Sequence, residues 1–444
     1  MDRDAHELAR RLMRLAVIGG GWAGLAAAVE ATSRGHAVTL YEMSSRLGGR
    51  ARRVESGGLS LDNGQHILIG AYTKTLDLMK RVGVDAERLL WRTPLCIAFA
   101  DGGTFVLPPG ASAIAFSRGV LARDGWRWSD RFALLRMAAA WALRGFRCAE
   151  HLTVAQLTAA LPAQVRAELV DPLCVAALNT PASLASASVF LRVLRDALFA
   201  GPGSAELLLP RVDLSALWPD TAAAWLAQAG TSLHLGHRVA QLQTSNAGWQ
   251  VDGEAYDAVV LAASPAEAAR LALPTAPAWS ACAQALHHEP ITTIILRSES
   301  SRLPRPMLAL HASATAPAQF VFDLGQLRDI DGALAFVISG ASNWVERGAH
   351  ETVQATLAQA RGALGPYLRE PLTVLRIFTE KRATFLCTPG LERPCARIAQ
   401  GLHAAGDYVA GPYPATIEGA VRSGVGAVHA LESARGHGRA SGVD

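Results

Sequence analysis

The first fifty residues alternate between short apolar runs and a glycine-rich turn. Residues 14–18 (RLAVI) form an apolar run of strand length, and residues 25–35 (LAAAVEATSRG) have the composition of a helix that ends at Gly35. A second strand-like run, residues 37–42 (AVTLYE), follows and ends in Glu42. The order strand, glycine turn, helix, strand predicts the start of a Rossmann-like α/β domain.

The turn between the first strand and the helix has the spacing G-x-G-x-x-G. Gly19 permits a tight turn, Gly21 lets the backbone approach a pyrophosphate, and Gly24 lets the helix pack closely on the strand. The backbone N–H groups at the start of the helix, those of Trp22 and Ala23, favour an anion. The turn therefore predicts a dinucleotide site, although a glycine turn that binds nothing has the same spacing.

A carboxylate follows at the distance expected of a ribose ligand. Glu42 lies 23 residues after Gly19 (42 − 19 = 23) and can accept hydrogen bonds from both ribose hydroxyls. Its charge would repel a 2′-phosphate, so NADP is disfavoured. The pattern does not by itself distinguish NAD from FAD.

Residues 42–50 read E-x-x-x-R-x-G-G-R. Gly48 and Gly49 let the chain run close past a cofactor, and Arg46 and Arg50 offer cations for a pyrophosphate. This segment resembles the flavin-dependent amine oxidase and phytoene desaturase superfamily, in which it wraps the FAD pyrophosphate. The resemblance implies FAD as the cofactor.

Further segments match the same superfamily in the expected order. They are 62–66 (DNGQH) beside the flavin, Arg238-Val239 in a strand that touches adenine, the return strand 256–265, and the closing segments 402–407 and 414–420. The resemblance implies that Asp407 bonds the ribityl or phosphate region and that a helix starting near Thr416 points at the flavin. Besides the residues above, the implied FAD ligands are Met43, Gly64, Gln65, His66, Val239, Gly406, Asp407, Thr416 and Ile417.

Four segments resemble one subgroup, the squalene-associated FAD-dependent desaturases, also called hydroxysqualene dehydroxylases. They are DNGQHILIGAY (62–72), LNTPASLASASVF (178–190), EKRATFLCTPG (380–390) and AGDYVAGPYPATIEGAVRSG (405–424). The resemblance runs from about residue 14 to residue 430. It implies that hydroxysqualene loses its hydroxyl and receives a hydride, giving squalene for hopanoid synthesis.

A C30 hydrocarbon with one polar atom requires a long apolar cavity. The blocks 94–200 and 270–380 hold suitable side chains, which serve equally well as ordinary core: Phe99, Phe105, Leu107, Phe116, Leu134, Trp141, Leu191, Leu194 and Phe199. His66 and Lys381 are the candidate proton donors. The alternative role of His66 is a structural hydrogen bond. The alternative for Lys381 is that it lies exposed at the end of a strand and takes no part in the reaction.

The charge and cysteine composition of the chain limits the kinds of partner that it can bind. Lys plus Arg exceed Asp plus Glu by only four (42 − 38), and the excess is spread thinly, which excludes a nucleic-acid-binding protein. The six cysteines show no CxxC pair and no zinc-ligand spacing, so we expect no metal site and a cytoplasmic protein with reduced thiols. No run of about 20 apolar residues predicts a membrane span.

Residues 112–147 combine tryptophans and arginines with apolar runs in a helical pattern. Such a basic amphipathic segment suits a headgroup interface, on the inner face of the cytoplasmic membrane, and suits equally a surface helix packed on the substrate domain.

The cofactor matches fall in three separated stretches, which predicts a discontinuous FAD domain. A substrate domain of the amine oxidase type, α+β with a mixed sheet and helices, is expected to fill the intervening blocks. The predicted bounds are 13–75, 205–270 and 395–435 for the FAD domain, and 76–204 and 271–394 for the substrate domain. Residues 1–12 look like a polar extension, with Met1 or Met13 as the native start, and residues 436–444 like a frayed tail.

Two other functions share these features. The same scaffold could desaturate a polyprenoid such as phytoene, or oxidise an amine. A protein of another class, an FAD-bound carrier of isoprenoid lipid without turnover, would also need the cofactor and an apolar cavity. No second nucleotide motif is evident, so an external electron donor or reductase is expected.

Overall fold

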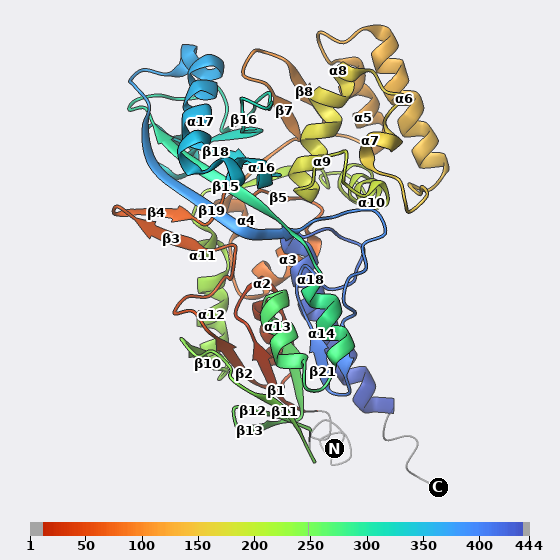
Figure 1. Ribbon diagram of the computed structural model, residues 1–444, viewed down its shortest axis with the longest axis vertical. Helices are drawn as coiled ribbons and strands as arrows, with labels where there is room; N and C mark the ends of the chain where they lie inside the picture. The colour runs from red at the N-terminus through yellow and green to blue at the C-terminus, as the bar shows by residue number, and fades with distance from the viewer. Residues whose placement is uncertain (1–11, 247, 438–444) are drawn as a thin grey trace.

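The computed structural model describes residues 12–246 and 248–437 (Figure 1). Most of the expected polar extension and of the expected tail lies outside these residues, as does Met1, one of the two expected starts. A lower domain is built on a parallel sheet. Above it lie an antiparallel sheet on one side and a group of helices on the other. The parallel sheet with its covering helices is the α/β architecture predicted from the sequence.

The lower sheet has six strands, and its strands come from three separated parts of the chain. Its order is β10 (Ser232–Leu235), β2 (Ala37–Glu42), β1 (Arg14–Ile18), β14 (Ala258–Leu261), β21 (Leu402–Ala404) and β20 (Arg397–Ala399). Every pair is parallel except that of β20 with β21. The bounds of β1 and β2 are those expected from the apolar runs. Helix α2 (Trp22–Ser33) begins three residues before the expected start, because the last glycine of the motif lies inside its first turn.

Helices cover both faces of this sheet, as its continuously buried strands require. Helices α2, α12 (Pro219–Gln228) and α18 (Ile417–His437) pack directly on its strands, and the lower domain also contains α3 (Thr73–Arg81), α11 (Leu214–Leu217), α13 (Pro265–Ala272) and α14 (Pro277–Gln284). A small antiparallel sheet, β11 (Leu242–Ser245), β12 (Gly248–Val251) and β13 (Glu254–Tyr256), extends the lower end. Helix α18 crosses α2 so closely that a Cβ on Gly424 would lie 2.1 Å from the carbonyl oxygen of Ala23.

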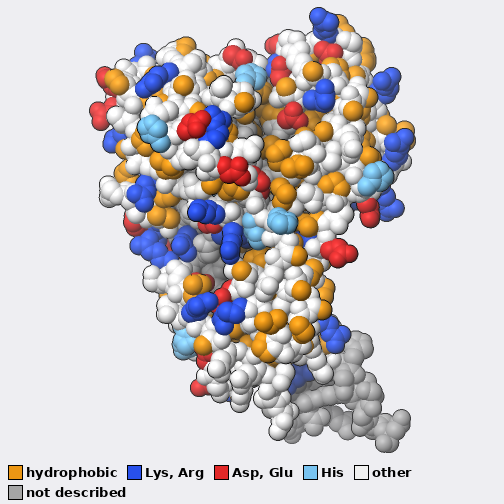
Figure 2. Space-filling model, viewed as in Figure 1, with side chains coloured by type: hydrophobic (Ala, Val, Ile, Leu, Met, Phe, Trp, Pro, Cys, Tyr) orange, Lys and Arg blue, Asp and Glu red, His pale blue; other side chains and the backbone are white. Residues whose placement is uncertain are grey.

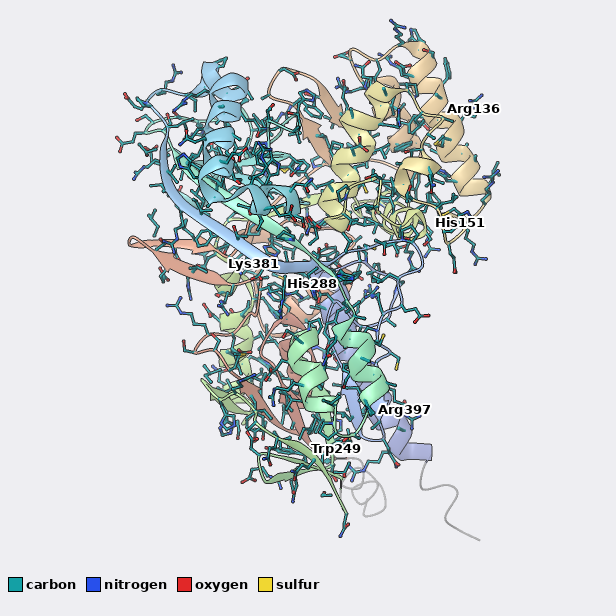
Figure 3. All side chains as sticks on the ribbon, viewed as in Figure 1. Arg136, His151, Trp249, His288, Lys381 and Arg397 are labelled. Atoms are coloured by element: carbon teal, nitrogen blue, oxygen red, sulfur yellow. The ribbon has the colours of Figure 1, made fainter. Side chains whose placement is uncertain are left out.

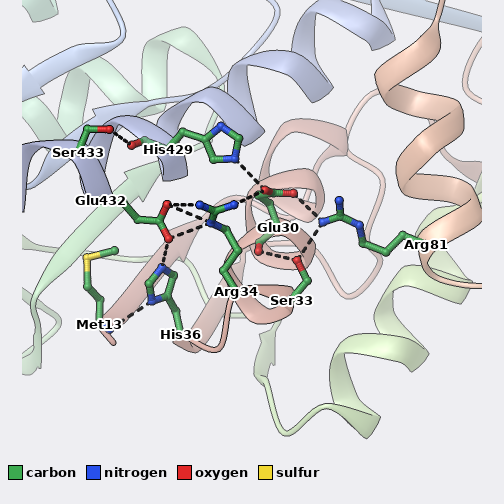
Figure 4. Close-up of polar contacts among 9 residues, drawn as sticks. All are labelled: Met13, Glu30, Ser33, Arg34, His36, Arg81, His429, Glu432 and Ser433. Atoms are coloured by element: carbon green, nitrogen blue, oxygen red, sulfur yellow. Dashed lines mark hydrogen bonds and ion pairs between the residues drawn. The ribbon is translucent and has the colours of Figure 1, made fainter. Parts of the chain in front are cut away.

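A polar network fastens α18 and α3 to α2 (Figure 4). The buried carboxylate of Glu30 accepts from Arg81 Nη1 at 2.6 Å and from His429 Nε2 at 2.7 Å. One turn after His429 on α18, the Glu432 carboxylate accepts hydrogen bonds from Arg34 Nε and from His36 Nε2, each at 2.9 Å. Burial alone would raise the pKa of the Glu30 carboxyl, but the hydrogen bonds from His429 and Arg81 lower it below its ordinary value of 4.5.

This network predicts a specific loss of stability in acid. Because the pKa of Glu30 is lower in the folded than in the unfolded chain, its contribution is complete above pH 4.5 and is lost as the pH falls through the folded value. We expect Glu30→Gln to lower the free energy of unfolding at pH 7 by roughly 1–3 kcal/mol, and the difference from wild type to shrink below pH 4.5. Urea unfolding at a series of pH values measures this, with the exposed Glu150→Gln as control. A difference that stays constant into acid would contradict the assignment.

The upper sheet has five strands and is antiparallel throughout. Its order is β16 (Met307–Ala309), β17 (Phe320–Asp323), β18 (Ala333–Ile338), β15 (His288–Arg297) and β19 (Thr373–Phe385). A mixed sheet is expected for this domain, and for these five strands that prediction is wrong, because each strand pairs only with antiparallel neighbours. An isolated bridge between Phe99 and Ala309 is the one parallel contact recorded at its edge within the described chain.

Alternate residues of this sheet face two different environments. Phe336 and Ile338 on β18 pack with Leu357 of α17 (Ala349–Leu364) in one core. Val337, between them, faces the other way into the cavity described below. The sheet thus forms a wall with helices behind it and ligand space in front. The adjoining helices are α15 (Leu324–Arg328) and α16 (Ser342–Arg347), with a 3₁₀ turn, η2 (Gly365–Tyr367).

The remaining chain forms the helical group and small sheets. The helices are α4 (Ala86–Leu89), α5 (Ser112–Leu121), α6 (Trp128–Leu143), α7 (Val154–Leu157), α8 (Ala163–Val165), η1 (Arg166–Val170), α9 (Asp171–Leu178) and α10 (Ala187–Leu198). The strands are β3 (Arg53–Ser56) with β4 (Leu59–Asp62), β5 (Leu68–Ile69) and β6 (Leu90–Thr93) with β9 (Leu207–Pro210), and β7 (Cys96–Ala98) with β8 (Thr104–Val106).

Across residues 12–246 and 248–437, none of the helices combines the length and apolar character needed to cross a bilayer.

Candidate functional site

One cavity of about 860 Å³ joins the lower and upper domains. Its lining includes the glycine turn after β1 and also apolar residues of α9, α10 and the upper sheet. The volume lies near the upper end of the usual range for ligand pockets, roughly 300–1,000 Å³. A nucleotide cradle and an apolar chamber are therefore parts of the same space.

The glycine turn has the geometry of an anion cradle. Gly19, Gly21, Trp22 and Ala23 all line the cavity. Gly19 has a φ of +109°, and α2 starts with no side-chain cap and no acidic residue in its first turn. Its leading N–H groups are thus open to a negatively charged ligand. Gly24 does not line the cavity.

The Glu42 carboxylate lies beside this turn at the end of β2. It is buried and lines the cavity, and it accepts from the backbone N–H of Gly20 at 2.6 Å and of Ser44 at 2.8 Å. These two bonds hold the carboxylate in place and leave other lone pairs free to accept from ribose hydroxyls. Met43, the next residue, also lines the cavity and is exposed.

The second glycine pair is brought against the first. The N–H of Gly48 donates to the carbonyl of Gly20 at 2.9 Å, and Gly48, Gly49 and Arg50 line the cavity. Arg50 donates to Asp407 Oδ1 at 2.6 Å. Burial alone would lower the pKa of Arg50, but the carboxylate of Asp407 raises it. Arg46 lies outside the lining, with its guanidinium 3.9 Å from the Glu55 carboxylate.

The segment after β4 contributes Gly64, Gln65 and His66 to the lining. His66 Nδ1 lies 2.9 Å from the carbonyl oxygen of Gly64, so this nitrogen carries the hydrogen and Nε2 is left as an acceptor. Burial lowers the pKa of His66 below its usual 6.5. At neutral pH the ring is therefore suited to accept a hydrogen bond rather than to give up a proton from Nε2.

Three residues that line this space each carry a buried polar side-chain atom with no hydrogen-bond partner among the described residues: Gln65 Nε2, Thr293 Oγ1 and Tyr408 Oη. Burial and the neighbouring Asp407 raise the pKa of Tyr408, so its hydroxyl keeps its proton. Leaving such donors unpaired costs roughly 1–3 kcal/mol each. They indicate a polar ligand on this side of the cavity.

Val239 lines the cavity, but the segment around it is not the expected strand. The carbonyl of Val239 accepts from Arg270 Nη2 at 2.6 Å, and the next two backbone N–H groups donate to Asp252. Since side chains satisfy this backbone, the segment needs no neighbouring strand.

The C-terminal segment closes the cradle. Gly406, Asp407, Thr416 and Ile417 line the cavity. Helix α18 starts at Ile417, as expected, and Thr416 Oγ1 accepts from the N–H of Gly419 at 3.0 Å. This N-terminus gives the cavity a second helix end that favours negative charge.

The apolar chamber is lined by other residues than those expected. Of the nine apolar side chains named from the sequence, Leu194 alone lines the cavity, and the other eight pack in the core or against it. The position of a side chain on its helix or strand decides whether it faces the cavity or the core, and the composition of a segment does not show that position. The main apolar residues of the chamber are Ile69, Leu173, Val175, Phe190, Val193, Leu194, Leu207, Ile291, Met307, Phe320, Phe322 and Phe378.

Lys381 is exposed on β19 (Figure 3) and does not line the cavity, whereas its neighbours Glu380 and Arg382 do. His66 and Lys381 are thus not brought together. His288, the first residue of β15, also lines the cavity and is not among the site residues predicted from the sequence. Burial and the nearby Arg50 lower its pKa. Strand alternation around His288 was the available signal.

The residues present fit FAD. The uncapped N-terminus of α2 and Arg50 suit a pyrophosphate, Glu42 suits a ribose, and the unpartnered atoms of Gln65 and Tyr408 suit polar atoms of the cofactor. Within the described chain, no group of three or more His, Cys, Asp or Glu side chains is placed to hold a metal ion.

Comparison with known proteins agrees with this reading. The sequence model of the family "flavin containing amine oxidoreductase" matches residues 22–431. A hydroxysqualene dehydroxylase from Zymomonas mobilis is 27% identical and one from Rhodopseudomonas palustris is 28% identical, each alignment covering 92% of this chain and 96% of the relative. The crystal structure of an oxidoreductase from Methanosarcina mazei superposes with a TM-score of 0.74 at 17% identity, covering 94% of this chain and 100% of that chain.

Proposed function

The chain belongs to the flavin containing amine oxidoreductase family and is an FAD-dependent oxidoreductase, and from that premise we propose that it reduces hydroxysqualene to squalene. The observation that supports this most is the continuity of the nucleotide cradle with a large apolar chamber. The relatives from Zymomonas mobilis and Rhodopseudomonas palustris, which match over nearly their whole length, carry the name hydroxysqualene dehydroxylase.

In the proposed reaction one C–O bond breaks and one C–H bond forms at the same carbon. The oxygen leaves as water after taking up a proton, and two electrons enter as a hydride. FAD, when bound and reduced, supplies that hydride. Because each turnover consumes two electrons, we also propose an external electron donor or reductase.

The protein's own residues would bind the hydrocarbon and exclude water. The apolar walls formed by α9, α10 and the upper sheet match a long isoprenoid chain. A dry chamber would protect a carbocation from capture by water. Thr293 and His66 both line this cavity, and His66 Nε2 would be an acceptor for a hydrogen bond from the substrate's single hydroxyl.

Filling the chamber tests the proposal. Ala177 lines the cavity on α9, and Ala177→Phe should slow squalene formation at least about tenfold, because the added ring occupies substrate space. FAD content should stay unchanged, since the residue is not part of the cradle. The control is Ala281→Phe at an exposed position on α14.

The assay offers hydroxysqualene to the dithionite-reduced holoprotein and quantifies squalene by mass spectrometry. The proposal fails if Ala177→Phe keeps the full rate. It fails also if the wild type converts only phytoene or an amine, which would make it a desaturase or an amine oxidase. FAD binding without any conversion would indicate a lipid carrier.

A further inference from the structure

Exposed apolar side chains are concentrated in one part of the upper helical group. Of the thirteen large hydrophobic side chains exposed among the described residues, six lie between residues 106 and 143. Five of them belong to α5 and α6: Ile114, Leu121, Trp128, Phe132 and Leu143. Trp128 and Phe132 are each 61% exposed and Leu143 is 90% exposed. We call these five residues and the intervening outer faces of the two helices the α5–α6 surface.

The α5–α6 surface follows helical periodicity. Trp128, Phe132 and Leu143 are spaced by four and eleven residues, so they lie on one face of α6. Ile114 and Leu121 are similarly spaced by seven on α5, which packs beside α6. The opposite faces, which include Phe116 and Trp141, are buried in the core. The two helices thus expose a second apolar face in addition to the one that packs.

The same segment is strongly basic. Residues 106–147 contain seven arginines and two aspartates, a net charge of +5 (7 − 2), whereas the whole chain carries +4. Arg118, Arg127, Arg136, Arg144 and Arg147 are exposed, and no ion pair is recorded for them within the described part of the chain. Figure 3 shows Arg136 projecting from the outer side of α6, and Figure 2 shows several cationic side chains along this edge.

Aromatic residues with arginines around them match a lipid headgroup layer. Arg131 lies over the Trp128 ring, with its Cζ 4.6 Å from the ring centroid, and the Trp128 and Phe132 rings are 6.1 Å apart. Apolar rings can enter the acyl boundary while the cations remain among the phosphates. A symmetric contact with a second copy would instead bring two sets of arginines together.

The α5–α6 surface is also close to the apolar chamber. Leu198 lines the cavity, and the next residue, Phe199, contacts Phe116 of α5 and Phe146 after α6, at ring distances of 5.5 and 5.1 Å. A single aromatic layer therefore separates the chamber from the two helices.

We propose that the α5–α6 surface binds the protein to a bilayer that contains anionic phospholipid. This would extend the proposed function, because an isoprenoid dissolved in the membrane would then be taken up beside the chamber. The biological reason for membrane binding rests on the proposed function. Binding itself is a property of this surface. It is therefore measured without any substrate, so that its failure and the failure of the proposed function are separate results.

Vesicle flotation of the holoprotein tests the proposal. The probes are vesicles of phosphatidylcholine alone and of phosphatidylcholine mixed with phosphatidylglycerol. Wild type should float with the mixed vesicles and much less with the neutral ones, and high salt should weaken the binding. Trp128→Ser combined with Phe132→Ser should lower the partition coefficient at least about tenfold.

The charge is tested by Arg136→Gln combined with Arg144→Gln. Each arginine should contribute roughly fivefold to binding of the anionic vesicles and little to the neutral ones. The matched controls are Leu273→Ser, directly after α13, and Arg361→Gln on α17, both exposed positions away from this surface, which should bind like wild type. FAD content and thermal melting show that each variant is folded.

Three results would overturn the proposal. The wild type could fail to bind mixed vesicles at low salt. The α5–α6 variants could bind as well as Leu273→Ser and Arg361→Gln. The third is a concentration-dependent dimer that is abolished by Trp128→Ser with Phe132→Ser while vesicle binding is absent, which would assign the surface to a second copy.

Discussion

Replacing Gly24 with alanine should remove the flavin from the protein. A Cβ at this position would lie 1.8 Å from the carbonyl oxygen of Gly19 and 3.3 Å from the Cβ of Ala262. The Gly19 carbonyl cannot move aside on its own, because it is part of the backbone of the turn. Helix α2 must therefore move away from β1, and its N-terminal N–H groups leave the cradle.

We expect Gly24→Ala to weaken FAD binding at least about a hundredfold, roughly 3 kcal/mol. The measurement is the flavin absorbance per protein after gel filtration and a titration of the apoprotein with FAD. The matched control is Gly362→Ala in α17, where a Cβ would meet nothing within 4 Å. That change should keep the flavin and stabilise the helix by about 0.5–1 kcal/mol. A Gly24→Ala protein with full flavin content would show that the turn does not hold the cofactor.

The second large effect should come from a buried ion pair between the two domains. Arg328 at the end of α15 donates to Asp62 at the end of β4, and the Arg328 and Asp62 side chains are 5% and 2% exposed. Asp62 also accepts from the backbone N–H of Leu214 at 2.8 Å. Arg328→Met leaves this carboxylate buried without its cation and should cost about 3–5 kcal/mol of unfolding free energy.

Chemical denaturation measures this loss. Adding Asp62→Asn to Arg328→Met should restore much of the stability, because no buried charge then remains. Glu254→Gln breaks the exposed pair with Arg14, at 4.0 Å, and should change the stability by less than about 1 kcal/mol. Equal effects of Arg328→Met and Glu254→Gln would contradict the buried-pair account. Since Asp62 precedes the segment from Asn63 to His66 that lines the cavity, Arg328→Met should also retain less flavin.

The nucleotide cradle could be predicted from the sequence because local rules determine it. Strand, turn and helix over residues 14–42 follow from a few adjacent residues, and the glycines report directly on close backbone approach. The start of α18 next to Thr416 is local in the same sense, since a threonine side chain caps the helix. Arg46 shows the limit of such rules, because its ion-pair partner Glu55 lies on a separate hairpin.

The apolar chamber could not be predicted in detail, because it depends on how distant elements pack. Leu191 is fully buried in the core whereas Leu194, one helical turn later, lines the cavity. The apolar run of β15 likewise conceals Thr293, which the antiparallel sheet turns toward the cradle. The expected strand around Val239 is absent for a related reason, since Arg270 and Asp252 satisfy its backbone from other elements.

One single-turnover measurement tests the central claim, that a reduced cofactor in this cradle reduces hydroxysqualene in the adjoining chamber. The purified holoprotein is photoreduced without oxygen in deuterium oxide and mixed with hydroxysqualene, and the flavin spectrum and the products are followed together. We expect return of the oxidised flavin spectrum with one squalene per flavin, each squalene carrying one deuterium on carbon. A flavin that stays reduced with hydroxysqualene, while the oxidised holoprotein is bleached by squalene or phytoene, would contradict it and show that hydride flows in the opposite direction.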